Sequence, residues 1–142
     1  MSDVFVSYAR DDRAKVEQLA KALEARGFNV WWDPELLPGE QYAQKISKVL
    51  ADCKAVLVVW SAASAARPWV LDEASVGRDR GILVPVRIEA TEAPLGFRQM
   101  QAEDLTNWPQ AGGDNFERIV RALELLRGAP AATPGPTFSA AP

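Results

Sequence analysis

Trp69 and Glu73, near the middle of the 142-residue chain, are two side chains that can act together on a ligand. A carboxylate stabilises positive charge that develops in a reaction, and an indole stacks on a flat ring. Pro68 suits the first turn of a helix, because its fixed φ matches the helix and its missing N–H would have no partner there. In that helix, positions i and i+4 share a face, so the two side chains lie one turn apart. They either line a cleft or are solvated at the surface.

A stripe of small residues continues along the same predicted helix, at Val70, Ala74 and Gly77. Their spacing of i, i+4 and i+7 marks one helix face, and small side chains let that face lie close to a sheet. The preceding run, 55–60, is apolar throughout, which is typical of a parallel strand covered on both faces. The helix with the indole and the carboxylate is therefore expected to pack directly on a buried strand.

Strands and helices alternate along the whole chain. Apolar runs predict strands at 4–8, 29–32, 55–60 and 82–88, and 104–107 is the candidate for a short fifth strand, with helices between the strands. This alternation predicts an α/β fold, a single flavodoxin-like domain with a five-stranded parallel sheet of order 2-1-3-4-5 and helices on both faces. Trp31 and Trp32 are adjacent in a strand and should point to opposite faces. Pro85 predicts that strand pairing on one side ends there.

Asp11 and Asp12 follow the first strand, and either can cap the next helix. The pair also resembles the acidic Mg²⁺ pocket of response-regulator receivers. That pocket needs a further aspartate at the end of the third strand, where this chain has Trp60 and Ser61. Capping is therefore the expected role.

The topology also predicts where a ligand would bind. In such a sheet, ligands bind beyond the carboxyl ends of strands one and three, where the chain connections reverse direction. The loops that meet there are 9–12 and 61–68. The predicted helix starts directly from the second loop, so Trp69 and Glu73 are expected at this crevice.

The composition excludes several kinds of site. The chain has no histidine, which removes Ser-His-Asp and Cys-His catalysis and every histidine-based metal site, and no metal is expected. Cys53, the only cysteine, is expected to be a small buried hydrophobe. No Gly-x-Gly-x-x-Gly or Walker motif is present, so dinucleotide binding on a helix N-terminus through such a loop is not supported.

Charge and hydropathy limit the expected partners and location. The net charge is −3 and arginines such as Arg67 and Arg87 are scattered, which argues against nucleic acid. No apolar run is long enough to span a bilayer and no signal peptide precedes the first strand, so we expect no membrane and a cytoplasmic location. Residues 1–127 are expected to form the domain, and 128–142, rich in Ala and Pro, a flexible tether.

Three segments carry the motifs of one family, in the same order along the chain. Asp3–Asp12 contains the pattern D-x-F-[IV]-S-Y of the family's first strand. Gly27–Asp33, followed by Leu37–Gly39, resembles the family's second strand and its long loop. Trp69–Glu73 has the pattern W-x-x-x-E. From Asp3 to about Leu126 the chain thus resembles a Toll/interleukin-1 receptor (TIR) domain of the bacterial NAD-cleaving type.

The resemblance implies an NAD⁺ glycohydrolase that cleaves the nicotinamide–ribose bond, with NAD⁺ as substrate and no cofactor. Glu73 is the expected catalytic residue, and the products would be nicotinamide and ADP-ribose or a cyclic isomer. The expected substrate-binding residues are Tyr8, Ala9, Arg10, Asp33, Ser61 and Trp69. Among these, Arg10 is the candidate for the pyrophosphate.

The resemblance also implies activation by self-association and a role in bacterial immunity, such as defence against phage. The expected interface loop is Leu36, Leu37, Pro38 and Gly39, and a fused or missing sensor domain is expected beyond the tether. Two alternatives stay open. One is a non-enzymatic module that recruits other TIR domains, and the other is an enzyme similar to nucleoside deoxyribosyltransferases, which would act on free nucleosides.

Overall fold

The structure is a computed structural model that describes residues 3–32, 39–110 and 112–128. Its parallel strands are β1 Val4–Ser7, β2 Val30–Trp31, β3 Ala55–Trp60, β4 Leu83–Arg87 and β5 Glu103–Asp104. They form one sheet in the order β2-β1-β3-β4-β5. The predicted α/β fold, with its five-stranded parallel sheet and strand order, is confirmed.

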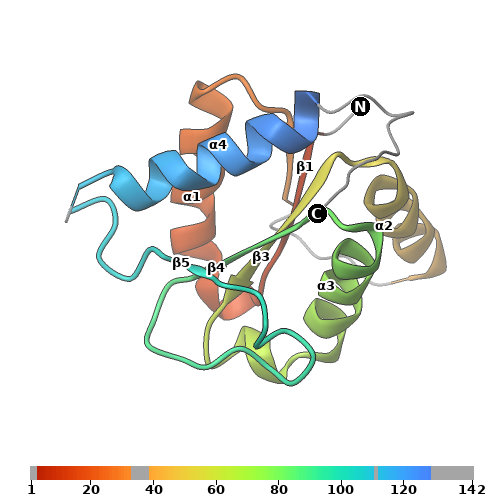
Figure 1. Cartoon of the computed structure of the whole chain (residues 1–142). Coiled ribbons are helices and arrows are strands. Elements are labelled where there is room, and N and C mark those ends of the chain that lie inside the picture. The colour runs from red at the N-terminus through yellow and green to blue at the C-terminus, as the bar shows by residue number, and fades with distance from the viewer. Residues whose placement is uncertain (1–2, 33–38, 111, 129–142) are drawn as a thin grey trace.

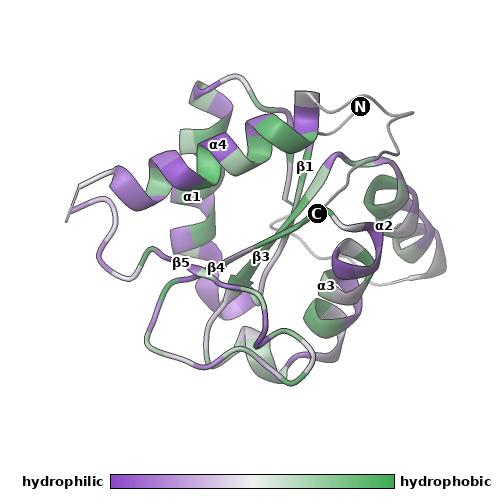
Figure 2. Cartoon of the chain, viewed as in Figure 1, coloured by the Kyte–Doolittle hydropathy of each residue, from purple (hydrophilic) through white to green (hydrophobic). Residues whose placement is uncertain are grey.

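Helices cover both faces of the sheet (Figure 1). α1 Arg13–Ala25 and α4 Asp114–Gly128 pack on one face, and α2 Glu40–Asp52 and α3 Pro68–Arg80 pack on the other. Two short 3₁₀ turns, η1 Arg10–Asp12 and η2 Ser64–Ala66, follow β1 and β3. Figure 2 shows strands that are hydrophobic along their length and helices in which hydrophobic and hydrophilic residues alternate. This pattern is expected when each helix buries one stripe against a sheet.

The core divides along β3 with a period of two residues. Leu57 and Val59 pack toward α1 and α4, whereas Val56, Val58 and Trp60 pack toward α2 and α3. Every residue of β3 is buried, because a central parallel strand is covered on both faces. The continuous apolar run in the sequence therefore corresponds to the middle strand of the sheet.

The two adjacent tryptophans lie on opposite faces of the sheet, as predicted. The Trp31 ring stacks on Phe5, with centroids 5.0 Å apart and planes 10° from parallel. The Trp32 ring packs against Tyr8, with centroids 6.4 Å apart. Trp31 thus joins the core under α2 and α3, and Trp32 joins the core under α1 and α4.

α3 lies very close to β3. Val70, Ala74 and Gly77 are buried on its sheet-facing side, as the small-residue stripe predicts. A Cβ on Gly77 would lie 2.7 Å from the Cβ of Val56, which is closer than real side chains approach. Glycine at this position therefore permits the close packing. Together with Pro68 at the first turn, it determines where the remaining side chains of α3 point.

The sheet edge at β5 is short. Pro85 limits pairing on the β5 side, but pairing there begins after the proline, at Val86 and Arg87, instead of ending at it, while pairing with β3 continues through Pro85. The bounds predicted for the fifth strand, 104–107, are wrong. The Asp104 carboxylate accepts hydrogen bonds from the backbone N–H of Thr106 at 2.9 Å and from its hydroxyl at 2.5 Å, and these bonds turn the chain.

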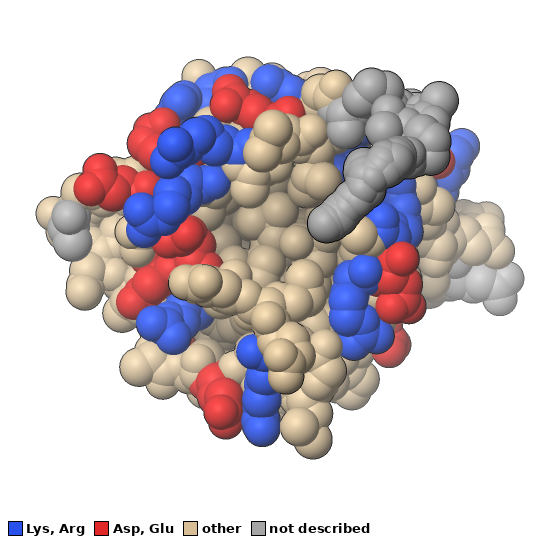
Figure 3. All heavy atoms as spheres, viewed as in Figure 1, with Lys and Arg blue, Asp and Glu red and all other residues tan. Residues whose placement is uncertain are grey.

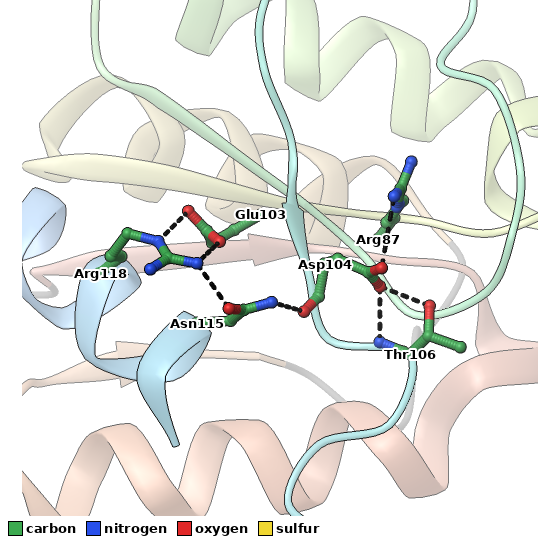
Figure 4. A network of polar contacts seen from close by, with 6 residues as sticks. All are labelled: Arg87, Glu103, Asp104, Thr106, Asn115 and Arg118. Atoms are coloured by element: carbon green, nitrogen blue, oxygen red, sulfur yellow. Dashed lines mark hydrogen bonds and ion pairs between the residues drawn. The ribbon is translucent and has the colours of Figure 1, made fainter. Parts of the chain in front are cut away.

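A network of polar side chains connects this edge to α4 (Figure 4). The Arg118 guanidinium donates hydrogen bonds of 3.0 and 2.9 Å to the two carboxylate oxygens of Glu103. The Asn115 amide donates to the Asp104 carbonyl, and Arg87 forms an ion pair of 3.3 Å with the Asp104 carboxylate. Side chains therefore reinforce an edge where only a few ladder hydrogen bonds form.

Asp12 occupies the N-cap position of α1, as predicted, but the capping hydrogen bond expected of Asp11 or Asp12 is missing. α1 begins at Arg13, directly after η1, and its N-cap residue, Asp12, makes no side-chain capping hydrogen bond. The Asp12 carboxylate instead accepts a hydrogen bond from the Ser61 hydroxyl, and Asp11 pairs with Arg67. Both aspartates are thus used to connect the end of β1 to the segment after β3.

Three other sequence predictions concern the core, the tether and membranes. Cys53 is buried as predicted, and its burial raises the pKa of the thiol. The expected tether lies outside the described residues from 129 onward, while Gly128 belongs to α4. No helix in the described part of the chain is long and apolar enough to cross a membrane.

Candidate active site

A cleft of about 820 Å³ opens beside α3. Its described lining comes from η1 after β1, from the start of α2, and from the segment that joins η2 to α3. The lining residues are Arg10, Asp11, Gly39, Ala43, Ile46, Ala66, Arg67, Pro68, Trp69 and Glu73. The cleft therefore lies beyond the carboxyl ends of β1 and β3, where the topology predicts a ligand site.

The Glu73 carboxyl is hydrogen-bonded to a residue of the sheet. The hydroxyl of Ser7, the last residue of β1, donates a hydrogen bond of 2.7 Å to Glu73 Oε1. Ser7 itself is fully buried, so this contact is shielded from solvent on the side of the sheet. The carboxyl thus lies between a buried strand and the open cleft.

The electrostatic setting of Glu73 disfavours its charged form. Burial raises the pKa of this carboxyl from its ordinary 4.5 to about 7, and the nearby Asp72 carboxylate also raises it. The hydrogen bond from Ser7 acts in the opposite direction and lowers the pKa. Near neutral pH, protonated and ionised forms of Glu73 are therefore both populated, as for many acids and bases in active sites.

Trp69 lies at the mouth of the cleft with 43% of its surface exposed. An exposed ring of this size on a monomer surface is available to stack on a ligand. The Arg67 guanidinium carbon lies 5.9 Å from the centroid of the indole, and Arg67 Nη2 lies 3.0 Å from Asp11 Oδ1. One aromatic ring and one ion pair thus border the opening above the glutamate.

The structure brings some of the predicted site residues together and keeps others apart. Arg10, Gly39, Trp69 and Glu73 line the cleft. Tyr8, Ala9 and Ser61 are buried and do not line it, since Tyr8 packs on Trp32 and Ser61 bonds to Asp12. Asp33, Leu36, Leu37 and Pro38 lie outside the described residues.

Comparison with known proteins identifies the family. The family model described as the TIR domain matches residues 4–120, which is most of the chain. The chain belongs to the TIR domain family. The predicted family is thus confirmed, while the comparison does not separate the NAD-cleaving type from other members.

Solved structures support the same fold for this TIR domain. The TIR domain of the Toll-related receptor TRR-2 from Hydra magnipapillata is similar with a TM-score of 0.75 and 19% identity, over 87% of this chain and 99% of that one. The TIR domains of the activated Roq1 resistosome give 0.62 and 21%, over 87% and 98%. A TIR-STING receptor from C. gigas gives 0.70 and 24%, over 87% and 39%. No curated protein matches the sequence.

Three polar residues of the site were not predicted from the sequence of this TIR domain. Ser7 holds Glu73, and Asp11 and Arg67 form the ion pair at the cleft. A serine in the otherwise apolar run at 4–7 is a signal for Ser7, because a buried hydroxyl needs a partner. No local motif marks Asp11 and Arg67 as an ion pair, although the topology predicts that the loops that carry them, 9–12 and 61–68, meet at this crevice.

Neither the charges on the face shown in Figure 3 nor the metal-ligating side chains of the described residues give a second candidate site. On the face shown in Figure 3, Lys and Arg are interspersed with Asp and Glu, and uncharged residues fill the centre. Within 3–32, 39–110 and 112–128, no group of three or more His, Cys, Asp or Glu side chains could hold a metal ion. The cleft at Glu73 is therefore the site on which a function is best argued.

The raised pKa of Glu73 predicts a pH-dependent stability. Ionising a carboxyl whose pKa is higher in the folded than in the unfolded chain destabilises the fold, so stability is lost as the pH rises from about 4.5 through 7. Glu73→Gln stays neutral and keeps an acceptor for Ser7. Relative to this variant, the wild type should lose up to about 3 kcal/mol of unfolding free energy across that range.

Urea unfolding near pH 5 and near pH 8 measures the difference between wild type and Glu73→Gln. Glu17→Gln is the control, because the salt bridge to Lys21 lowers the pKa of Glu17 and the loss should be absent. A difference between wild type and Glu73→Gln that is the same at both pH values would contradict the electrostatic environment described for Glu73.

Proposed function

We propose that this TIR domain hydrolyses NAD⁺ at the nicotinamide–ribose bond. The observation that carries the proposal is the placement of the Glu73 carboxyl, hydrogen-bonded to Ser7 and facing a cleft whose mouth bears an exposed Trp69. The cleft is lined by Arg10 and Arg67, which suit a ligand with phosphate groups. The W-x-x-x-E resemblance points to the same glutamate.

Cleavage of this bond needs no general acid to protonate the leaving group. When the bond between ribose C1′ and nicotinamide breaks, the bonding electron pair neutralises the pyridinium ring, and nicotinamide leaves as a neutral base. Positive charge then develops on the ribose as an oxocarbenium ion. Water adds to C1′ and releases a proton, giving ADP-ribose. The difficult feature of this sequence is the sugar cation.

The Glu73 carboxylate is suited to stabilise that cation. A fixed anion in a partly dry site stabilises developing positive charge more strongly than it would in water. The indole of Trp69, one helical turn away, provides a surface for the flat nicotinamide ring. The protein therefore supplies charge and orientation, and none of these roles requires histidine or a metal.

Nicotinamide release from NAD⁺ tests the proposal directly. Glu73→Gln should lower the rate by roughly 10²-fold to 10³-fold, because the charge opposite the sugar cation is lost. Asp79→Asn, an exposed carboxylate on the same helix and away from the described cleft lining, should leave the rate unchanged.

Release that is equally fast in Glu73→Gln would refute the role of Glu73. A chain that releases no nicotinamide under any condition, while still associating with other TIR domains, would favour the non-enzymatic alternative. Release from free nucleosides but not from NAD⁺ would favour an enzyme similar to nucleoside deoxyribosyltransferases.

The groups around Glu73 predict how activity depends on pH. Since the ionised carboxylate is the active form, the rate should rise with pH and level off above an apparent pKa near 7. Ser7→Ala removes the hydrogen bond that lowers this pKa, so the midpoint should move up. Asp72→Asn removes a charge that raises it, so the midpoint should move down.

The two midpoints are read from kcat/KM for NAD⁺ against pH, because this ratio reports the ionisation of the ligand-free protein. Opposite shifts in Ser7→Ala and Asp72→Asn identify Glu73 as the titrating group, since a general loss of structure would not reverse its sign between two variants. Shifts in the same direction, or none, would mean that another group controls the rate.

We further propose that self-association activates this site. Gly39, the one described residue of the predicted interface loop, lines the same cleft as Glu73, so a second subunit that contacts Gly39 would lie beside the site. Specific activity should therefore rise with protein concentration, as measured by nicotinamide release over a dilution series. A specific activity that stays constant across the series would count against this mode of activation.

A further inference from the structure

Arg67 connects three parts of the cleft. It is the N-cap residue of α3, its guanidinium lies over the Trp69 ring, and it forms an ion pair with Asp11 from the turn after β1. All three residues line the cleft. The guanidinium is therefore held at the mouth of the site from two sides.

The spacing along α3 separates this cation from the carboxylate. Arg67 and Glu73 are six positions apart, which is roughly 9 Å along the helix at about 1.5 Å per residue. Trp69 lies between them. In the proposed substrate the pyrophosphate is joined through C5′ to the ribose that carries nicotinamide, so a cation and a carboxylate on one wall of the cleft can bind the pyrophosphate and face the ribose of one molecule.

The ion pair with Asp11 is easily exchanged. The two side chains are 37% and 55% exposed, and exposed ion pairs contribute little to stability. A phosphate group accepts two parallel hydrogen bonds from a guanidinium and matches its geometry better than a single carboxylate oxygen. A phosphate that enters the cleft therefore competes well with Asp11 for Arg67.

We infer that Arg67 binds the pyrophosphate of NAD⁺ and that Asp11 holds the guanidinium in place until the substrate displaces it. The inference rests on the proposed function, because it assigns a part of the same substrate. It makes Arg67 a residue that selects nicotinamide dinucleotides over nicotinamide nucleosides. Arg10, the neighbour of Asp11 in η1, lines the same cleft and is a second cation available to the pyrophosphate.

Two substrates separate phosphate binding from catalysis. Arg67→Gln should raise KM for NAD⁺ about tenfold through the loss of charge-assisted hydrogen bonds. It should leave kcat unchanged, since the phosphate is bound equally in ground and transition states. For nicotinamide riboside, which has no phosphate, the same variant should show no change in KM. Asp11→Asn should lower KM for NAD⁺, because the competing carboxylate is gone.

Arg121→Gln provides the matched control, because it removes an exposed arginine of α4 that does not line the cleft. It should leave both substrates unaffected. An equal rise in KM for NAD⁺ and nicotinamide riboside in Arg67→Gln would overturn the inference, because it would mean that Arg67 supports the fold of the site. No rise with either substrate would overturn it as well.

Titration calorimetry of the full chain with inorganic pyrophosphate tests the anion site independently of the proposed function. Weaker binding to Arg67→Gln and tighter binding to Asp11→Asn support the anion site, even if no nicotinamide is released and the proposed function fails. Pyrophosphate binding that is identical in wild type and Arg67→Gln would overturn the anion site, even if Glu73 proves essential for release.

Discussion

The hydrogen bond between Ser7 and Glu73 joins the first strand to the third helix at the edge of the cleft. It forms because α3 lies unusually close to the sheet, and that approach depends on a glycine, Gly77, facing Val56. A larger residue at position 77 would lift the helix and move the glutamate away from its donor. Packing one turn further along the helix thus determines where the Glu73 carboxyl lies.

The ionisable groups of the cleft differ in their exposure to solvent. Glu73 is partly removed from water, which raises its pKa to about 7, while Arg67 and Asp11 remain exposed and charged. A carboxyl near its midpoint is sensitive to any neighbour that donates a hydrogen bond or carries charge. The exposed pair is less sensitive, because solvent screens it. The buried surroundings of Glu73 therefore set its pKa, and the exposed Arg67 is available to recognise a charged ligand.

Much of this architecture is readable from local patterns. The apolar run at 55–60, the small-residue stripe of α3 and Pro68 together predict a helix close to a central strand, and strand alternation predicts the order of the sheet. Trp69 and Glu73 follow from their spacing. The roles of Asp11 and Asp12 do not, because they depend on Arg67 and Ser61 from a distant segment. Local rules favour helix capping for such aspartates, and tertiary contacts override that preference.

One helix carries the cation, the ring and the acid, since Arg67, Trp69 and Glu73 all belong to α3 or to its N-cap. The facing side of the cleft comes from a separate element, the start of α2, with Gly39, Ala43 and Ile46. Any widening or narrowing between the two helices changes the room above the three side chains while their mutual spacing stays constant. The arrangement of the three side chains is thus set by α3 alone. The access of a ligand to them depends separately on the position of α2.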